Sequence, residues 1–476
     1  MHDKKIHMIG IGGIGMSALA FILAEKGSNV SGSDIEENNI VKKLHKKGIA
    51  ADIGHDASRV NGRDLVVFSS SIRADNPELL QARKNRAKVI SRIELLKMVM
   101  EKYERVIGVT GTHGKTTITA MAAHLLEEAG FDPTVLIGGE SPHFAGNAKL
   151  GKSGTLAAEV DESDGRLVTL TGLTHIIVPN LEREHLEHYR DEAHLVNTFR
   201  DFLRGQTKKG TLFCNSDDGN LKKIKGAYGG KVTCFGFSED ADARLSAVQK
   251  GILKIDFDCS VRQKKIGRFT INIPGIHNAL NAAAVISLGL ELGIGADTIK
   301  RALAGYRGVK RRFEIIGTLN GARVVEDYAH HPTEVKATIS AACSLKPKRL
   351  IAVFQPHRYT RTKYFYKEFA SAFSGADEVI LAGVYSASEE KIEGASSKRI
   401  YDIMVRDKTL PVKLVETGKI GEYLCRNAKN GDLVLVMGAG DIGKVMRGIG
   451  LSTYQEGSGP SGNEARLFEN KRESII

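Results

Sequence analysis

Apolar and polar positions along the chain follow two alternating periods. Short runs rich in β-branched residues, such as Lys5–Ile9, Val106–Val109 and Leu350–Phe354, end at Gly or polar residues, and longer segments with helical spacing lie between such runs. Runs of this length and composition predict buried strands, and the longer segments predict helices. Strands that alternate with helices form parallel sheets, so we expect an α/β fold.

A Gly-rich turn follows the first predicted strand. Residues Gly10–Gly15 read Gly-Ile-Gly-Gly-Ile-Gly, a helix is predicted over Met16–Lys26, and the next strand ends at Asp34. This is the pattern of a Rossmann-like βαβ unit, in which the glycines admit a diphosphate to a helix N-terminus and an acid about 20 positions later binds a ribose. Dinucleotide binding is the plain interpretation, so a nicotinamide dehydrogenase is one candidate function.

A second Gly-rich turn, Gly111–Thr117, has a phosphate-binding pattern. Its sequence, Gly-Thr-His-Gly-Lys-Thr-Thr, separates the strand Val106–Val109 from a helix-like run over Thr119–Ala129. Glycines let backbone N–H groups surround an anion, the Lys would reach the β- and γ-phosphates, and the first Thr hydroxyl would hold Mg²⁺. The general motif requires Gly at the position of Val109, so this turn is a shorter variant of it.

Polar side chains also lie at the ends of other predicted elements. Glu159 and the acids after it end the strand Thr155–Val160, and acids beside a nucleotide are candidate Mg²⁺ ligands. Asn278 and Asn281 are three positions apart at the start of a helix, so their amides share one face. They would recognise an adenine edge or phosphates, or would only cap the helix.

The 476 residues predict three domains, at roughly 100–200 residues per domain. We expect a Rossmann-like domain over 1–100, a central P-loop ATPase-type domain with a parallel sheet over 101–310, and a C-terminal Rossmann-like α/β domain over 311–450. Short β-rich pieces between 207 and 273 predict an antiparallel patch. Residues 451–476 are Gly, Ser and charge with little periodicity, so we expect a mobile tail.

Composition limits the possible partners and compartment. The net charge is +12, but the basic residues are dispersed and no aromatic stripe accompanies them, which favours acidic, phosphorylated small substrates over nucleic acid. The five Cys are scattered and form no Cys-x-x-Cys pair, which is typical of reduced thiols in a cytoplasm. No apolar run approaches the ~18 residues that span a bilayer, and the first residues lack an apolar signal region. We therefore expect a cytoplasmic protein, as a monomer or a dimer.

Seven signatures in one order make the chain similar to the Mur ligases, which join an amino acid to a carboxylate at the expense of ATP. They are Gly10–Ser17, Gly111–Thr117, Glu159 with Asp161–Asp164, His277–Asn281, Arg311–Phe313, Asp327–Pro332 and Phe354–Thr362. The resemblance covers about residues 5–447. Within the family, the chain looks like the members that add L-alanine to the lactyl carboxylate of UDP-N-acetylmuramate in peptidoglycan synthesis.

This resemblance implies ATP and Mg²⁺ as cofactors and an acyl-phosphate intermediate, with no enzyme nucleophile. It implies catalytic roles for Lys115, Glu159, His185 and Arg312, with Mg²⁺ held by Thr116, Glu159 and His185. ATP would bind to Gly111, Thr112, His113, Gly114, Lys115, Thr116, Thr117, Asn278, Asn281, Arg312 and Asp327. The UDP-sugar would bind to Gly12, Gly13, Ile14, Gly15, Asp34 and Ser70. The muramyl carboxylate and the alanine would meet His330, His357, Arg358 and Arg361.

One position departs from the family pattern, and two further functions compete. Glu184 precedes His185 where the family usually has Asp, so the role of Glu184 is open. Within the family, a recycling ligase attaches a whole tripeptide to the same UDP-sugar, but the stretch Gln355–Arg361 favours the alanine enzyme. A dehydrogenase would account for residues 5–34 but would leave Lys115 unexplained, and an ATP-driven binding module would not explain the third domain.

Overall fold

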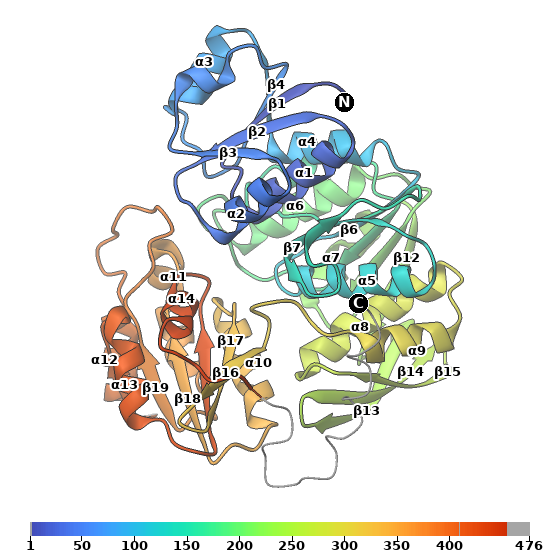
Figure 1. Cartoon of the computed structure of the whole chain (residues 1–476). Coiled ribbons are helices and arrows are strands. Elements are labelled where there is room, and N and C mark those ends of the chain that lie inside the picture. The colour runs from blue at the N-terminus through green and yellow to red at the C-terminus, as the bar shows by residue number, and fades with distance from the viewer. Residues whose placement is uncertain (1, 409, 455–476) are drawn as a thin grey trace. The chain divides into compact units, whose positions relative to one another are not determined.

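The computed structural model describes residues 2–408 and 410–454. In this part of the chain, helices flank three β-sheets, as the sequence pattern predicts (Figure 1). The chain divides into two units, Met1–Arg312 and Phe313–Ile476. The first unit contains two of the sheets and the second unit contains the third.

The first sheet has five parallel strands in the order β3-β2-β1-β4-β5, which confirms the Rossmann-like expectation. Ile6 and Met8 pack on one face with α1 and α4, whereas Ile9 packs on the other face with α3 and η1. The strand order reverses beside β1, where such sheets bind nucleotides. The elements are β1 (Lys5–Ile9), α1 (Ile14–Glu25), β2 (Asn29–Asp34), α2 (Asn39–Lys46), β3 (Ala50–Ile53), η1 (Ala57–Val60), β4 (Leu65–Phe68), α3 (Pro77–Lys84), β5 (Lys88–Ser91) and α4 (Arg92–Met100).

The second sheet has ten strands in the order β15-β14-β13-β12-β11-β10-β6-β9-β7-β8. Its strands are β6 (Arg105–Val109), β7 (Thr134–Ser141), β8 (Gly146–Lys149), β9 (Thr155–Glu159), β10 (His175–Val178), β11 (Thr211–Asn215), β12 (Lys231–Gly236), β13 (Ala243–Gly251), β14 (Lys254–Val261) and β15 (Lys264–Ile271). The centre of the sheet is parallel, but β8, β14 and β15 run antiparallel to their neighbours, so the sheet is mixed. The expected antiparallel patch over 207–273 is wrong for β11 and β12, which join the parallel part because the helix α7 (Gly219–Ile224) connects them.

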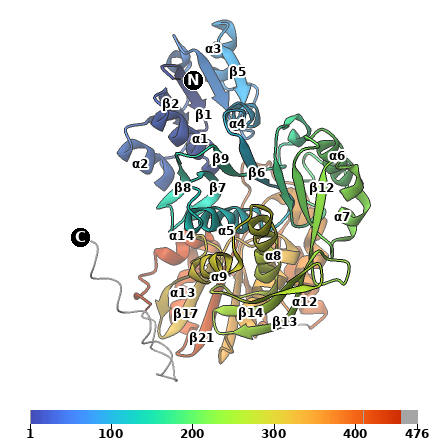
Figure 2. The same cartoon turned by 90° about the vertical axis from the view of Figure 1, so that its right-hand side faces the viewer.

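Helices cover both faces of this second sheet. One face packs against α5 (Lys115–Glu128), α8 (Ile276–Glu291) and α9 (Ala296–Gly305), which lie side by side in Figure 2. The other face packs against α6 (Glu192–Arg204) and α7 (Gly219–Ile224). The helix after the phosphate-binding turn starts at Lys115 and not at Thr119, because the turn leads directly into it and Gly114 is its N-cap. The 3₁₀ helices η2 (Leu167–Thr169) and η3 (Lys225–Ala227) complete this part of the chain.

The second unit contains a six-stranded sheet in the order β16-β17-β21-β18-β19-β20, in which only β16 is antiparallel. Its elements are β16 (Glu314–Leu319), β17 (Ala322–Asp327), α10 (Pro332–Cys343), β18 (Arg349–Phe354), α11 (Tyr359–Ser371), β19 (Glu378–Leu381), α12 (Ser397–Arg406), β20 (Val412–Leu414), η4 (Thr417–Lys419), α13 (Ile420–Asn427), β21 (Asp432–Met437) and α14 (Ile442–Arg447). Ser452 pairs with Thr318 of β16, so the start of the expected tail is bound to the sheet. Residues 455–476 of that tail lie outside the described residues.

None of the described helices combines the length and the apolar composition needed to cross a bilayer.

Candidate active site

The turn between β6 and α5 is shaped by two glycines. Gly111 has φ of 112° and Gly114 has φ of 84°, values that glycine adopts readily and other residues rarely do. A Cβ on Gly111 would lie 2.8 Å from the Asn180 carbonyl oxygen, and a Cβ on Gly114 would lie 2.7 Å from Asn281 Oδ1. Both positions therefore exclude a side chain, and the turn keeps its backbone accessible at the N-terminus of a 14-residue helix.

Asn180 and Glu182 hold the turn in place from the neighbouring strand end. The Asn180 side chain accepts a hydrogen bond from His113 N at 2.7 Å and donates one to His113 O at 3.1 Å. Thr112 Oγ1 accepts from Glu182 N at 2.9 Å and donates to Glu182 O at 3.2 Å. No role for Asn180 was predicted from the sequence. Its position two residues after β10 was an available indication, but the adjacency of β10 and β6 was not evident from the sequence.

Lys115 is folded back over the turn. Its Nζ donates to Gly111 O at 2.6 Å, to Thr112 O at 3.0 Å and to Glu162 Oε1 at 2.9 Å. Burial alone would lower the pKa of Lys115, but the charges of Glu162 and Asp161 outweigh this effect and raise it. The ammonium group therefore stays charged at the position where phosphate oxygens would replace the backbone carbonyls.

Thr116 and Glu159 lie together at the ends of α5 and β9. Thr116 Oγ1 donates to Glu159 Oε1 at 3.1 Å, and Gly138 N of β7 donates to Glu159 Oε2 at 2.7 Å. Burial raises the pKa of Glu159, against the attraction of Lys115. A Cβ on Gly138 would overlap both Glu159 carboxylate oxygens, so only glycine fits beside this carboxylate.

The oxygen atoms around this point suit a hard divalent cation. The Thr116 hydroxyl and the Glu159 carboxylate are oxygen ligands of the kind that Mg²⁺ takes beside substrate phosphates. Glu162 adds a buried carboxylate whose Oε2 has no hydrogen-bond partner among the described residues. Buried polar atoms are normally paired, so this orphan oxygen indicates room for a ligand. The donor set present here therefore fits Mg²⁺.

His185 lies beside the same acids. Its Nε2 is 3.4 Å from Glu162 Oε1 and its Nδ1 is 3.5 Å from Glu187 Oε1. Burial lowers its pKa, but the nearby carboxylates of Glu162 and Glu187 more than compensate and raise the pKa to about 9. In this arrangement the ring is a cation that pairs with Glu162, and a metal would have to displace its proton. Glu184 accepts a hydrogen bond from His185 N at 3.1 Å, which gives the unassigned acid a backbone role.

Asn278, Asn281 and Arg312 belong to the same unit. Asn281 Nδ2 donates to Asn278 Oδ1 at 3.1 Å, and Asn278 Nδ2 donates to Pro274 O at 2.6 Å, so the two amides share one face as predicted. Asn281 also faces Gly114 of the turn. The positive charge of Arg312 acts on Glu159 and opposes the upward shift of its pKa.

The Gly-rich turn of the first sheet is held by Asp34. Asp34 Oδ2 accepts a hydrogen bond from Gly12 N at 2.8 Å, and Ser33 O accepts bonds from Gly10 N and Ile11 N at 2.8 and 3.0 Å. Gly13 is the N-cap of α1, and Ile14 is its first residue. Asp34 therefore shapes the turn. Ser70 is exposed in the loop after β4.

In the second unit, Asp327 fixes the backbone at the end of β17. Its Oδ2 accepts from Phe313 N at 2.8 Å and its Oδ1 accepts from Ala329 N at 2.8 Å. These bonds determine how the chain enters the unit and how it leaves β17. The predicted nucleotide ligand Asp327 is thus also an anchor of the loop that carries His330.

His330, His357 and Arg361 come together in this unit. The two imidazole rings are 6.1 Å apart, and Arg361 Nη1 donates to His357 O at 2.9 Å and lies 3.2 Å from His357 Nδ1. His357 stacks on Tyr385, with ring centroids 5.5 Å apart. Tyr385 was not predicted as a site residue; it follows β19 at the same edge of the sheet as His357.

Arg358 has a different environment from its neighbours. It adopts φ of 70°, and its Nη1 is 3.5 Å from Glu389 Oε1. Glu389 also accepts hydrogen bonds from the Thr360 backbone and hydroxyl, at 3.1 and 2.5 Å. Arg358 is therefore paired with an acid that the sequence analysis did not single out.

Comparisons with known proteins agree with this arrangement. Three family profiles match in succession: "Mur ligase family, catalytic domain" over residues 5–104, "Mur ligase middle domain" over 109–289 and "Mur ligase, glutamate ligase domain" over 311–440. The chain belongs to the Mur ligase family of ATP-dependent ligases. This assignment removes the nicotinamide dehydrogenase from the candidate functions.

The relatives within the family are more specific. The chain is 40% identical over 444 residues to the UDP-N-acetylmuramate–L-alanine ligase of Desulforamulus reducens. The aligned residues cover 92% of this chain and 96% of that protein. It is 41% identical over 441 residues to the protein of the same name from Anaeromyxobacter dehalogenans, with 92% and 96% covered. A solved UDP-N-acetylmuramate-alanine ligase from Thermotoga maritima is 30% identical, with a TM-score of 0.81 and 94% and 98% of the two chains covered.

Proposed function

We propose that this chain joins L-alanine to the lactyl carboxylate of UDP-N-acetylmuramate at the expense of ATP, a step of peptidoglycan synthesis. The observation that carries the proposal is the phosphate-binding turn with its buried Lys115, within a chain that matches alanine-adding relatives over 92% of its length. The absence of an enzyme nucleophile from the reaction agrees with a site built of cations, amides and carboxylates.

The chemistry has two steps. A lactyl carboxylate oxygen attacks the γ-phosphorus of ATP, the bond from that phosphorus to the bridging oxygen breaks, and ADP leaves with the electron pair. The alanine amine then attacks the acyl carbon, the bond from carbon to phosphate oxygen breaks, and inorganic phosphate leaves as the amine loses a proton. In such transfers, the protein contributes positioning and charge neutralisation.

The residues of the first unit provide both contributions in this proposal. Gly111–Gly114 would bind the phosphates through backbone N–H groups, while Lys115 and Arg312 would neutralise charge on the transferring group. Thr116 and Glu159 would hold Mg²⁺, which when bound neutralises the β- and γ-phosphate oxygens. His185 would orient Glu162 or, once deprotonated, complete the metal site.

The remaining ligands are assigned by the chemistry of their side chains. The turn that Asp34 holds would take the diphosphate of UDP, with Gly12, Gly13, Ile14 and Gly15 at the N-terminus of α1. Ser70 would lie beside the same nucleotide. In the second unit, Arg361 and the two imidazoles of His330 and His357 would bind carboxylate groups, because a guanidinium fork matches carboxylate geometry. Asn278, Asn281 and Asp327 would contact ATP. Arg358 would bind the same carboxylate groups as Arg361.

We also propose the domain limits 1–100, 101–310 and 311–450. Support comes from the change of unit after Arg312 and from profile matches over 5–104, 109–289 and 311–440. We place the protein in the cytoplasm, where UDP-sugars and ATP are available, and we leave its oligomeric state open.

Product mass spectrometry tests the proposal. The full chain is incubated with UDP-N-acetylmuramate, ATP, Mg²⁺ and either a mixture of amino acids or the tripeptide that a recycling ligase would use. We expect a product heavier by one alanyl residue, with phosphate release that needs both the UDP-sugar and the amino acid. A tripeptide product without an alanyl product would identify the recycling ligase, and phosphate release without the UDP-sugar would contradict both activities.

A further inference from the structure

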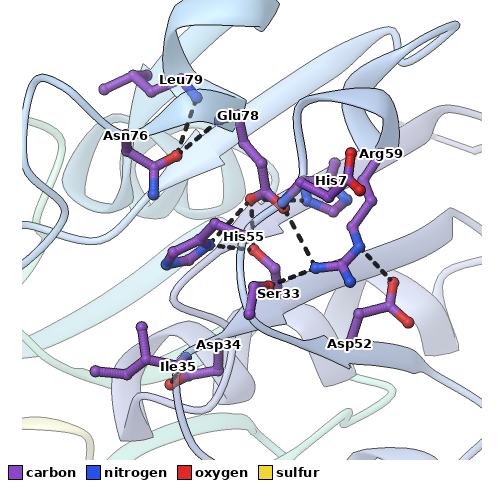
Figure 3. Close-up of polar contacts among 12 residues, drawn as sticks. His7, Ser33, Asp34, Ile35, Asp52, His55, Arg59, Asn76, Glu78 and Leu79 are labelled. Carbon is purple, nitrogen blue, oxygen red and sulfur yellow. Dashed lines mark hydrogen bonds and ion pairs between the residues drawn. The ribbon is translucent and has the colours of Figure 1, made fainter.

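The first sheet contains a buried charged cluster that the proposed reaction does not use. At its centre is Glu78, in the first turn of α3, with a fully buried side chain (Figure 3). Its Oε2 accepts a hydrogen bond from Ser33 Oγ at 2.5 Å and lies 3.4 Å from both His7 Nε2 and His55 Nδ1. Its Oε1 accepts from Asp56 N at 3.1 Å. One carboxylate thus connects β1, β2, α3 and the loop after β3.

Glu78 is ionised in this cluster. Burial alone would raise its pKa, but the bonds from His7, Ser33 and Asp56 N–H outweigh burial and lower it. Arg59 Nη1 lies 3.6 Å from Oε1 and adds a positive charge. An ionised carboxylate only accepts hydrogen bonds, so each group that contacts it must provide the hydrogen.

This requirement fixes the tautomer of His55. The hydroxyl of Ser33 has one hydrogen, which lies in its bond to Glu78. His55 Nδ1 is 3.1 Å from Ser33 Oγ and 3.4 Å from Glu78 Oε2, and neither oxygen has a hydrogen to offer it. Nδ1 therefore carries the hydrogen. In a neutral imidazole, Nε2 is then an acceptor.

The acceptor lies beside the proposed UDP site. Gly54 precedes His55, and its N–H donates to the Asp34 backbone oxygen at 2.8 Å. The Asp34 side chain in turn accepts a hydrogen bond from Gly12 N. Arg59 also bonds to Gly54 O and holds this loop in place. The His55 side chain keeps 15% of its surface exposed, and no hydrogen bond of its Nε2 is found within the described residues. An oriented acceptor thus stands at the carboxyl edge of the sheet, one strand beyond the ribose-binding position.

We propose that His55 Nε2 accepts a hydrogen bond from N3–H of the uracil base, and that Glu78 is the positioning residue that holds His55 in the required tautomer. The proposal rests on the proposed function, because it deepens the UDP site. Uracil offers a hydrogen at N3, whereas cytosine has a bare acceptor there. An acceptor at this point would therefore select uridine over cytidine nucleotides, while Asp34 takes the ribose.

Calorimetric titration of the full chain at pH 8, where an ordinary imidazole is neutral, tests the contact. UDP is compared with its N3-methyl and 2′-deoxy analogues, for the unaltered chain and for His55→Ala. We expect N3-methylation to weaken binding about 5- to 10-fold in the unaltered chain and about 2-fold or less in His55→Ala, as for one lost hydrogen bond. The 2′-deoxy penalty should be the same in both proteins.

An N3-methyl penalty of equal size in both proteins would overturn the uracil contact, and so would a 2′-deoxy penalty that disappears in His55→Ala. The titration also separates this inference from the function on which it rests. A chain that binds neither UDP nor UDP-N-acetylmuramate contradicts the proposed function. A chain that binds both without the expected difference contradicts the His55 contact alone.

Glu78→Gln tests the positioning role. The amide that this change introduces can donate to His55 Nδ1, which allows the opposite tautomer, so we expect KM for the UDP-sugar to rise about 3- to 10-fold with kcat unchanged and with a smaller N3-methyl penalty. Glu25→Gln on the exposed end of α1 is the matched control and should change neither value. ¹⁵N spectra of labelled histidines in the unaltered chain give a second test that does not depend on the folding of the variant. They should show His55 with hydrogen on Nδ1, and the opposite tautomer would overturn the proposal.

Discussion

Arg92 Nη2 lies 3.1 Å from Asp161 Oδ2 and joins the first sheet to the second. Arg92 is the first residue of α4, and Asp161 follows β9 at the phosphate-binding edge. Arg92 Nη1 also lies 3.2 Å from the position that a Cβ on Gly15 would occupy. One guanidinium group thus contacts both the turn proposed for UDP and the acids next to Lys115. It is the main attraction that holds the pKa of Asp161 well below its usual range despite burial.

Arg92→Gln should therefore lower the stability of the protein. We expect the free energy of unfolding to fall by about 1–2 kcal/mol, less than for a fully buried pair because Asp161 keeps partial contact with water. Urea unfolding of Arg92→Gln, Asp161→Asn and the double variant measures the pair. If the two single effects simply add in the double variant, the two side chains are not coupled.

Lys115→Ala should strongly lower turnover and leave the fold intact. The side chain donates to two carbonyls of its own turn and to Glu162, and in the reaction it would neutralise the transferring phosphoryl group. We expect kcat to fall by about 10²–10³-fold or more, as for the loss of one charged donor in a buried site. Phosphate release and circular dichroism are measured beside Lys222→Ala, an exposed control on α7. Normal ligation by folded Lys115→Ala would refute the role of the turn.

Asp34→Ala should weaken the binding of the UDP-sugar but not the binding of ATP. The change leaves Gly12 N without its acceptor and removes the acid at the end of β2. We expect KM for UDP-N-acetylmuramate to rise about 10-fold, the equivalent of roughly 1.4 kcal/mol, with KM for ATP unchanged. Titration with NAD tests the nucleotide specificity, and the unaltered chain should not bind NAD. Tight NAD binding would mean that the first sheet binds a different nucleotide.

Stability should decrease in mild acid because of His124. Burial, and next the neighbouring His143, lower the pKa of His124 to about 4. The unfolded chain binds this proton near pH 6.5 and the folded chain only near pH 4, so stability is lost as pH falls through that window. From this group we expect a loss of about 2 kcal/mol between pH 7 and pH 5. The measurement is urea unfolding at both pH values, in which His124→Phe should show a correspondingly smaller change. Equal changes in the two proteins would refute the assignment.

The sequence predicted those features that depend on local pattern. The Gly-rich turns, the strands before them and the shared face of Asn278 and Asn281 all follow from periodicity and spacing, and the structure has them. Patterns of this kind are local, because glycine conformations and helix faces are determined by neighbours in the chain.

Features that depend on strand order could not be predicted in the same way. Asn180 supports the phosphate-binding turn only because β10 lies next to β6, and Glu78 meets His55 only because α3 packs against η1, which follows the loop after β3. The placement of β11 and β12 was wrong for the same reason, since a short β-rich segment does not reveal which neighbour it will pair with. Such contacts join residues far apart in the chain, and their amino-acid types are ordinary.

The close approach of Gly138 to Glu159 has a consequence for mutational surveys. Position 138 has no side chain and takes no part in the chemistry, yet any replacement would force the carboxylate from its position. A saturation survey scored on growth would therefore find position 138 as intolerant as position 159. It would also find no conservative substitution at position 138, since no amino acid other than glycine lacks a Cβ. Intolerance that does not vary with the chemistry of the replacement would thus separate residues that make room for the active site from residues that act in it.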